Sequence, residues 1–397
     1  MRLVVVGASL AGLRACEAAR RAGWTGEVVL VGAEEHLPYD RPPLSKALLE
    51  LDGPRLPPTH RSADELAALG VELRLGAAAT ALDLARRVVH VGGDDLAYDR
   101  LVLATGAQAR TVPGARTLRT VEDAVAVRTA LDAAARTVVV GAGFIGAEIA
   151  SAARARGLQV TLVEAAPVPL LRAAGPVVAT RLLDLHRAAG VDLRCGVSVD
   201  AVRPGRVSLS DGTVVAADLV VAGTGATPAT GWLAGSGLLL QDGVVCDEGL
   251  QAAPGVWAAG DVARWPSPLL GLARLEHWTA AAEQGAHAGR AAAGEPAPFT
   301  TVPYAWSQLH GRAVQAVGRT SGAAVEVVGD DAGWVALYRD GDRLVGALSV
   351  DLPGRIIKLK RLVAAGATFA EGLTAAAGSA AAGSARPSLP AAPTPGG

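Results

Sequence analysis

The first residues with recognisable chemistry form a glycine-rich turn near the start of the chain. Gly7, Ser9 and Gly12 occupy the three positions of a GxGxxG pattern, with Ser9 in place of the central glycine. Such a turn brings backbone close to a pyrophosphate, and a helix beginning near residue 10 would point free N–H groups at it. Glu34 follows at the spacing expected for a ribose-binding carboxylate, and Glu35 is the competing choice. The alternative is an ordinary β-α turn followed by a solvated carboxylate.

A second, intact fingerprint lies at Gly141, Gly143 and Gly146, directly after the apolar run TVVV and before a helical stretch. Glu164 ends the next apolar run, where a carboxylate can bind ribose hydroxyls. Two like charges 4 Å apart repel by roughly 4 kcal/mol at an effective dielectric of 20, so a 2′-phosphate would be disfavoured. We therefore expect NADH to be preferred over NADPH, although the positive charge of Arg172 could reduce that preference.

A third signal is the Gly260-Asp261 pair, which ends the apolar run in VWAAGDVA (residues 256–263). A carboxylate at the carboxyl end of a strand is well placed to hold a polyol chain, so Asp261 is our candidate for the ribityl anchor of FAD. An Asp that only caps a turn is the alternative. With two nucleotide folds upstream, the pattern favours FAD in the first site and NADH in the second.

The elements that must position these residues repeat along the chain. Residues 3–35 and 137–167 share one order: a β-branched run, a Gly-rich turn, an Ala-rich helix and a second apolar run. That order is typical of a Rossmann half-fold. Further buried strands are expected within 101–110 and 219–230, and short alternating strands after residue 300 predict a small antiparallel sheet.

We therefore expect an α/β protein with two three-layer Rossmann-like domains and a small C-terminal α+β domain. The expected FAD-binding domain is discontinuous and consists of residues 1–110 and 242–303. We expect the NAD-binding domain at 111–241, the C-terminal domain at 304–377 and a disordered tail of Ala, Ser, Pro and Gly at 378–397.

Bulk properties exclude several classes of function. The 397 residues carry a formal net charge of −1, which disfavours nucleic-acid binding. Cys16, Cys195 and Cys246 are far apart and form no CxxC pair or metal cluster, which fits a reducing cytoplasm and predicts no metal. Glycines and charges interrupt the apolar N-terminal run, and no apolar stretch has the length of a membrane span. We expect a cytoplasmic monomer or homodimer.

Several motifs, in order, resemble the flavoprotein reductases that feed ferredoxins, a family with two dinucleotide folds. The resemblance covers residues 1 to about 365. The motifs are HLPYDRPPLSK, LVLATG, GAGFIGAEIA, GTGATPATGWL, VWAAGDVARW, LEHWTAAAEQG and PYAWS. One departure from the family is the stretch 305–311, AWSQLHG, where the common pattern is FWSDQYG.

The resemblance implies roles for further residues. Lys46 would lie near the flavin ring and within range of Glu148, and both are candidate catalytic residues. An ammonium there would stabilise the anion that reduction creates. Trp278 would be the closest ring contact, and Trp306 would cover the flavin from the third domain, although tryptophans in apolar segments are usually core. Lys46 at a solvated helix start is the alternative reading of that residue.

Two sets of cofactor-binding residues follow. For FAD they are Gly7, Ser9, Leu10, Ala11, Gly12, Glu34, Glu35, Arg41, Lys46, Ala79, Thr105, Gly106, Arg119, Gly260, Asp261, Glu276, His277, Trp278 and Trp306. For NAD they are Gly141, Gly143, Phe144, Ile145, Gly146, Glu148, Glu164, Arg172 and Gly225.

The hypothesis that follows is an NADH-dependent ferredoxin reductase: NADH gives a hydride to FAD, and single electrons pass to an iron-sulfur ferredoxin that serves an oxygenase. Two alternatives share the folds: an NADH oxidase or electron-entry part of a nitrite reductase, and a non-enzymatic redox-sensing protein that binds FAD and NADH. A disulfide reductase is disfavoured because PPLSK (residues 42–46) lacks a redox cysteine. Arg312, Arg319 and the cluster at 355–361 are candidates for docking an acidic ferredoxin.

Overall fold

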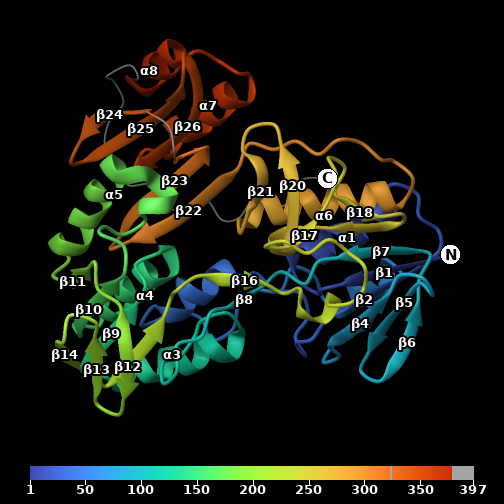
Figure 1. Cartoon of the computed structure of the whole chain (residues 1–397), viewed down its shortest axis with the longest axis horizontal. Helices are drawn as coiled ribbons and strands as arrows, with labels where there is room; N and C mark the ends of the chain where they lie inside the picture. Colours follow the sequence, from blue (N-terminus) through green and yellow to red (C-terminus); the bar gives the residue numbers. More distant parts are fainter. Residues whose placement is uncertain (322–323, 378–397) are drawn as a thin grey trace.

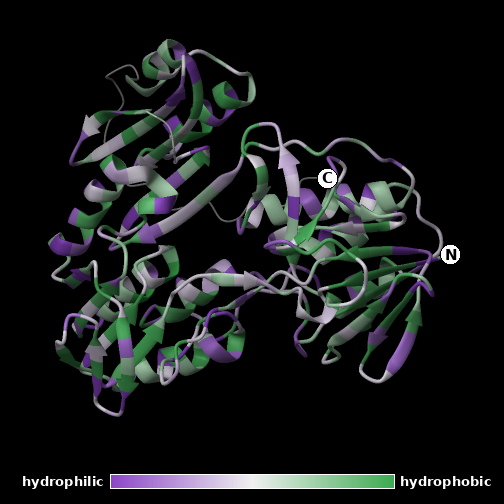
Figure 2. Ribbon diagram, in the orientation of Figure 1, coloured by the Kyte–Doolittle hydropathy of each residue, from purple (hydrophilic) through white to green (hydrophobic). Residues whose placement is uncertain are grey.

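The computed structural model describes residues 1–321 and 324–377, so the tail expected at 378–397 lies outside the described residues. Two parallel sheets and one antiparallel sheet organise these residues (Figure 1). Hydrophobic residues run along the strands of both parallel sheets, because such strands are buried on both faces (Figure 2). The expected α/β fold class is confirmed.

The first parallel sheet is assembled from both ends of the sequence. Its strands, in spatial order, are β18 (Gln251–Ala253), β19 (Val256–Ala258), β7 (Arg100–Leu103), β1 (Arg2–Val6), β2 (Glu27–Val31) and β3 (Val71–Arg74). All neighbours are parallel except β18 and β19. The Gly7 turn and Gly260-Asp261 therefore follow the carboxyl ends of strands in one sheet, which is where ligands bind in open α/β sheets.

Two helices cross closely on this sheet. They are α1 (Leu10–Arg21) and α6 (Trp278–Ala292). A Cβ added at Gly285 or Gly289 of α6 would lie 2.1 or 2.2 Å from the carbonyl oxygens of Ala11 and Ala15 in α1. Only glycine permits that approach, and it fixes the middle and second half of α6 against the first half of α1.

Smaller elements complete the first module. They are 3₁₀ turns at Pro42–Ser45, Ala47–Leu49 and Gly260–Val262, helix α2 (Ala63–Ala68), the hairpins of β4 (Ala79–Asp83), β5 (Val88–Val91) and β6 (Asp94–Ala97), and the sheet of β17 (Val244–Val245), β20 (Ala263–Ser267) and β21 (Gly271–Arg274).

The second parallel sheet repeats the plan of the first. Its strands, in spatial order, are β11 (Asp192–Cys195), β10 (Gln159–Glu164), β9 (Arg136–Val140) and β15 (Leu219–Ala222). The elements around it are α3 (Val121–Ala133), α4 (Phe144–Ala155), α5 (Leu171–Ala188) and the antiparallel β12 (Val199–Arg203), β13 (Arg206–Leu209) and β14 (Val214–Ala216). Helix α5 is kinked at Gly175, which precedes Pro176.

A two-stranded ribbon of β8 (Ala107–Ala109) and β16 (Ala226–Pro228) joins the two modules (Figure 1). Directly after β16, a 3₁₀ turn at Gly231–Leu233 places Leu233 in the core of the first module, and Leu238 and Leu240 pack against that core. We therefore propose that the chain returns to the first module at β16, earlier than the boundary expected at residue 241.

The C-terminal sheet is antiparallel, as the short alternating strands after residue 300 predict. Its strands, in spatial order, are β22 (Tyr304–Leu309), β23 (Arg312–Gly318), β26 (Arg343–Val350), β25 (Gly333–Asp340) and β24 (Ala324–Asp330). Helices α7 (Pro353–Ala364) and α8 (Phe369–Ala377) follow it, and α7 packs on β26 and β23. The sheet also packs against α5, since Val178, Leu182 and Tyr338 belong to one apolar cluster.

Candidate functional site

One continuous cleft of about 1430 Å³ is lined by residues of both glycine-rich turns. That volume exceeds the range of roughly 300–1000 Å³ usual for a single small-molecule pocket. Most of the expected cofactor residues line it: Gly7, Ser9, Leu10, Ala11, Glu34, Arg41, Lys46, Ala79, Thr105, Gly106, Arg119, Gly260, Asp261, Glu276, His277, Trp278, Trp306, Gly141, Gly143, Phe144, Ile145, Glu148, Glu164, Arg172 and Gly225.

Three expected residues are outside the cleft lining: Gly12, Gly146 and Glu35. A Cβ added at Gly12 would lie 1.9 Å from the Gly7 carbonyl oxygen, and one at Gly146 would lie 1.9 Å from that of Gly141. These two glycines therefore serve the tight turn and helix packing. Of the competing carboxylates, Glu34 lines the cleft, whereas Glu35 lies beside Gly76, where an added Cβ would be 3.3 Å from Glu35 Cγ.

The helices after the two turns leave their first amides without side-chain caps. Neither Ser9 at the start of α1 nor Gly143 at the start of α4 makes a side-chain capping bond. By contrast, α2 and α3 begin with complete capping boxes at Ser62 and Thr120. The free N–H groups of α1 and α4 at the cleft are therefore suited to phosphate oxygens.

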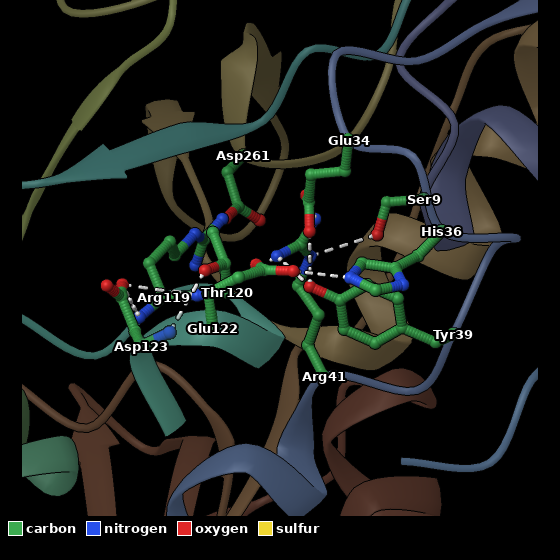
Figure 3. Close-up of polar contacts among 10 residues, drawn as sticks. All are labelled: Ser9, Glu34, His36, Tyr39, Arg41, Arg119, Thr120, Glu122, Asp123 and Asp261. Atoms are coloured by element: carbon green, nitrogen blue, oxygen red, sulfur yellow. Dashed lines mark hydrogen bonds and ion pairs between the residues drawn. The ribbon is translucent and has the colours of Figure 1, made fainter. Parts of the chain in front are cut away.

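A network of charged and polar side chains surrounds the Glu34 carboxylate (Figure 3). The Tyr39 hydroxyl donates to Glu34 Oε2 at 2.6 Å, and Arg41 Nη2 lies 2.5 Å from Glu34 Oε1. Arg41 also donates through Nε to Ser9 Oγ at 3.1 Å and through Nη1 to the Arg119 carbonyl at 2.8 Å. Burial raises the pKa of the Tyr39 hydroxyl, which therefore remains a donor.

A second pair of expected FAD residues meets at the same end of the cleft (Figure 3). Arg119 Nη2 lies 2.9 Å from Asp261 Oδ2, which joins the segment before α3 to the strand-end Asp of the first sheet. At the margin, His36 Nε2 lies 2.5 Å from Glu122 Oε1, and this hydrogen bond lowers the pKa of the Glu122 carboxyl.

The Glu164 carboxylate is held by backbone rather than by side chains. The Ala142 N–H donates to Oε2 at 2.8 Å, and the Ala166 N–H donates to Oε1 at 2.9 Å. Arg172, at the start of α5, also lines the cleft. A carboxylate fixed in this way beside the Gly141 turn can accept hydrogen bonds from ribose hydroxyls.

Where the two halves of the cleft meet, Lys46 Nζ lies 2.8 Å from Glu148 Oε1. The resemblance placed these two residues within range of each other, and the geometry brings them into an ion pair. Two hydroxyls also donate to Glu148, from Ser45 and Ser307, each at 2.5 Å. Neither serine is among the site residues expected from the sequence, although both lie inside motifs that carry the resemblance.

Aromatic side chains border the same region. Trp278 and Trp306 pack edge to face with ring centroids 5.9 Å apart, and both line the cleft. Trp278 Nε1 donates to Asp40 Oδ1 at 2.7 Å, which fixes its ring. The buried His277 Nδ1 has no partner among the described residues, and burial lowers the pKa of this imidazole. A polar atom of this kind at the cleft is ready for a ligand.

The three cysteines lie away from the cleft lining. Burial raises the pKa of Cys16 and of Cys246 to about 12, so both thiols stay protonated. Burial also raises the pKa of Cys195. Thiol–disulfide chemistry needs an accessible thiolate, which none of these residues provides.

These observations fit two dinucleotides. Uncapped helix ends suit two pyrophosphates, Glu34 and Glu164 suit two riboses, and Lys46 with the tryptophans suits a flavin ring. The site thus has the features of a pyridine-nucleotide-dependent flavoprotein reductase.

Comparison with known proteins supports this class of protein. The chain belongs to the pyridine nucleotide-disulphide oxidoreductase family, whose model matches residues 1–285, and residues 304–380 match the reductase C-terminal model. It is 35% identical to the ferredoxin–NAD(+) reductase component of the p-cumate 2,3-dioxygenase system of Pseudomonas putida, covering 91% of this chain and 93% of that protein. It is 34% identical to rhodocoxin reductase of Rhodococcus erythropolis, covering 92% and 90%.

Among solved structures, the chain is similar to the reductase in a covalent putidaredoxin reductase–putidaredoxin complex. The TM-score is 0.88 at 33% identity, covering 92% of this chain and 93% of that one. The likeness therefore includes all three sheets. No helix in the described ranges is long and apolar enough to cross a membrane.

Proposed function

We propose that this protein is an NADH-dependent ferredoxin reductase with FAD as its cofactor, and that its electrons serve an oxygenase. The observation that carries the proposal is the single cleft into which both glycine-rich turns open, with the Lys46–Glu148 pair where the two halves meet. The relatives named as ferredoxin–NAD(+) reductases support the acceptor. The three free thiols fit a cytoplasmic location, where thiols stay reduced.

When bound, FAD accepts a hydride from NADH and releases electrons singly. The protein's own residues prepare the site for that exchange. Arg41 neutralises Glu34 and closes the segment around residues 36–46 over the first site. Glu164 orients the second nucleotide, and the ammonium of Lys46 provides positive charge at the centre of the cleft.

For the acceptor, we propose that helix α7 forms the centre of the docking surface. Arg312 and Arg319 are already paired with Asp351 and Asp340, which lowers their value for docking. Lys358 and Arg361 on α7 are exposed. A positive helix face of this kind would speed the approach of an acidic ferredoxin.

The acceptor is tested by stopped-flow reoxidation of NADH-reduced protein. We expect a ferredoxin to reoxidise it much faster than dioxygen does, with a rate that falls steeply as salt is added. Lys358→Glu should slow the ferredoxin reaction, whereas Arg86→Glu, an equal charge change at an exposed hairpin arginine of the first module, should not. Faster reaction with dioxygen would instead indicate an NADH oxidase, and equal salt profiles for ferredoxin and a small dye would exclude electrostatic docking.

A further inference from the structure

The buried Glu148 carboxylate is the point where three parts of the fold meet. Glu148 lies on α4 of the second module and is only 4% exposed. Ser45 and Lys46 come from the segment after β2 in the first module, and Ser307 comes from β22 of the C-terminal sheet. A carboxylate this deeply buried is stable only when its charge is compensated by partners.

The partners of this carboxylate occupy both of its oxygens. Oε2 accepts the Ser45 hydroxyl, and Oε1 accepts both Lys46 Nζ at 2.8 Å and the Ser307 hydroxyl at 2.5 Å. Ser307 is itself 1% exposed. Its neighbour Trp306 lines the cleft, and successive strand residues point to opposite faces. One strand of the third sheet therefore supplies both a ring at the cleft and a hydroxyl behind the ion pair.

We propose that Ser307 is a positioning residue for the Lys46–Glu148 pair, an inference that rests on the proposed function. Its hydroxyl and that of Ser45 share the negative charge of Glu148, so that Lys46 is not the only compensating donor. The ammonium then keeps more of its positive field in the cleft, where reduction adds negative charge. Without Ser307, Glu148 would draw more strongly on Lys46 and that field would weaken.

The docking of β22 does not depend on this hydroxyl. The His310 N–H, at the end of the same strand, donates to Ser151 Oγ on α4 at 2.9 Å, and Ser151 Oγ donates to the Ala147 carbonyl at 2.7 Å. Leu309 also lies in an apolar cluster with Ala147. Removing the Ser307 hydroxyl should therefore change the surroundings of Glu148 and leave the strand in place.

The test compares Ser307→Ala with Ser349→Ala. Ser349 is a matched control because it is a buried serine of the same sheet whose hydroxyl has no partner among the described residues. Two readouts are measured on FAD-loaded protein: the midpoint potential of the flavin, and the pH profile of its reduction by NADH. Loss of one hydrogen bond to a charged group corresponds to about a tenfold change in a rate or equilibrium constant.

For Ser307→Ala we expect a more negative potential, a shifted pH profile and reduction about tenfold slower, while Ser349→Ala behaves like the wild type. Ser45→Ala should act in the same direction as Ser307→Ala. In a Glu148→Ala background, Ser307→Ala should add nothing, because the residue through which it acts is gone.

The inference is overturned if Ser307→Ala matches Ser349→Ala in potential and pH profile, or if its effect persists without Glu148. Either result leaves the proposed function standing. If the wild-type protein fails to bind FAD or to be reduced by NADH, the proposed function fails first, before any variant is compared.

Discussion

The first and second dinucleotide modules use the same backbone contacts at their turns. Gly7 N–H donates to the Val31 carbonyl at 2.8 Å, and Gly141 N–H donates to that of Val163 at 2.7 Å. Arginines in the last turns of α1 and α4 also correspond: Arg20 Nε donates to the Leu69 carbonyl before β3, and Arg154 Nε donates to the Ala189 carbonyl before β11, each at 2.9 Å. The duplication therefore includes side-chain contacts far from the ligands.

The acidic residues of the two modules differ in what holds them. Glu34 is bound by the side chains of Tyr39 and Arg41, which belong to a segment that lines the cleft. Glu164 is held only by the backbone N–H groups of Ala142 and Ala166 among the described residues. We infer from this difference that the first site retains its nucleotide and the second exchanges it.

The two modules also contact the C-terminal sheet differently, and we expect the difference to affect stability at low pH. The first module uses the Trp278–Trp306 contact, whereas the second uses His186 Nδ1 and His310 Nε2, 2.9 Å apart. Burial lowers the pKa of both imidazoles to about 4. The charge of His310 lowers the pKa of His186 further, and the charge of Arg154 lowers that of His310.

Because the folded pKa values of these histidines lie below the unfolded value, the unfolded chain binds more protons as the pH falls. Their contribution to stability is complete above about pH 6.5 and is lost toward pH 4, by roughly 3 kcal/mol for the fully buried His186 and by less for the more exposed His310. Urea unfolding at a series of pH values should show this loss of stability. His310→Asn should reduce the loss because Asn does not titrate, and Asn is chosen because it tolerates the positive φ of residue 310. An equally steep fall in the variant would show that other groups cause it.

Glu164→Ala should change cofactor preference by about a hundredfold in favour of NADPH, because repulsion of a 2′-phosphate is removed and two N–H groups become available to it. The ratio of kcat/KM for NADH and NADPH measures this. Asp192→Ala is the control, since it removes the same charge from the opposite end of the same sheet. Equal kcat/KM values for the two cofactors in the wild-type protein would refute the role of Glu164.

Arg41→Ala should weaken FAD binding by about tenfold, because one charge-assisted hydrogen bond to Glu34 and the closure toward Arg119 are lost. The dissociation constant of FAD from titration of apoprotein measures this change, and the KM for NADH should stay the same. If NADH binding fell as much as FAD binding did, the segment would serve both sites and the comparison would fail.

Gly143→Ser should have the smallest effect. It copies the Ser9 version of the fingerprint into the second module, where the φ of residue 143 is −74° and the nearest heavy atom to an added Cβ is 4.0 Å away. We expect the free energy of unfolding to change by less than about 0.5 kcal/mol and the KM for NADH to rise no more than about threefold. Loss of NADH binding would show that the two turns are not equivalent.

Local patterns allowed much of this fold to be predicted from the sequence. The strand before Gly7, the helix starting at Leu10 and the antiparallel strands after residue 300 all depend on short-range periodicity. The return of the chain to the first module that we propose at β16 was harder to predict, because it depends on where Leu233 packs rather than on a turn signal.

For the site, GxGxxG spacing placed the turns and favoured Glu34, but Glu35 stayed a competing choice because adjacent carboxylates look alike until the sheet fixes which one faces the cleft. Ser307 was invisible as a partner of Glu148 because the two residues are far apart in sequence and meet only when the third sheet docks on α4. Contacts of this kind have no local pattern.

The most direct test of the account is an anaerobic titration of the purified protein with NADH, followed by its visible absorbance. We predict a yellow protein that keeps one FAD per chain through gel filtration and is bleached by one equivalent of NADH, with the spent nucleotide washing out freely. A colourless protein that takes up no FAD, or a yellow one that NADH does not bleach, would contradict a retaining first site and an exchanging second site.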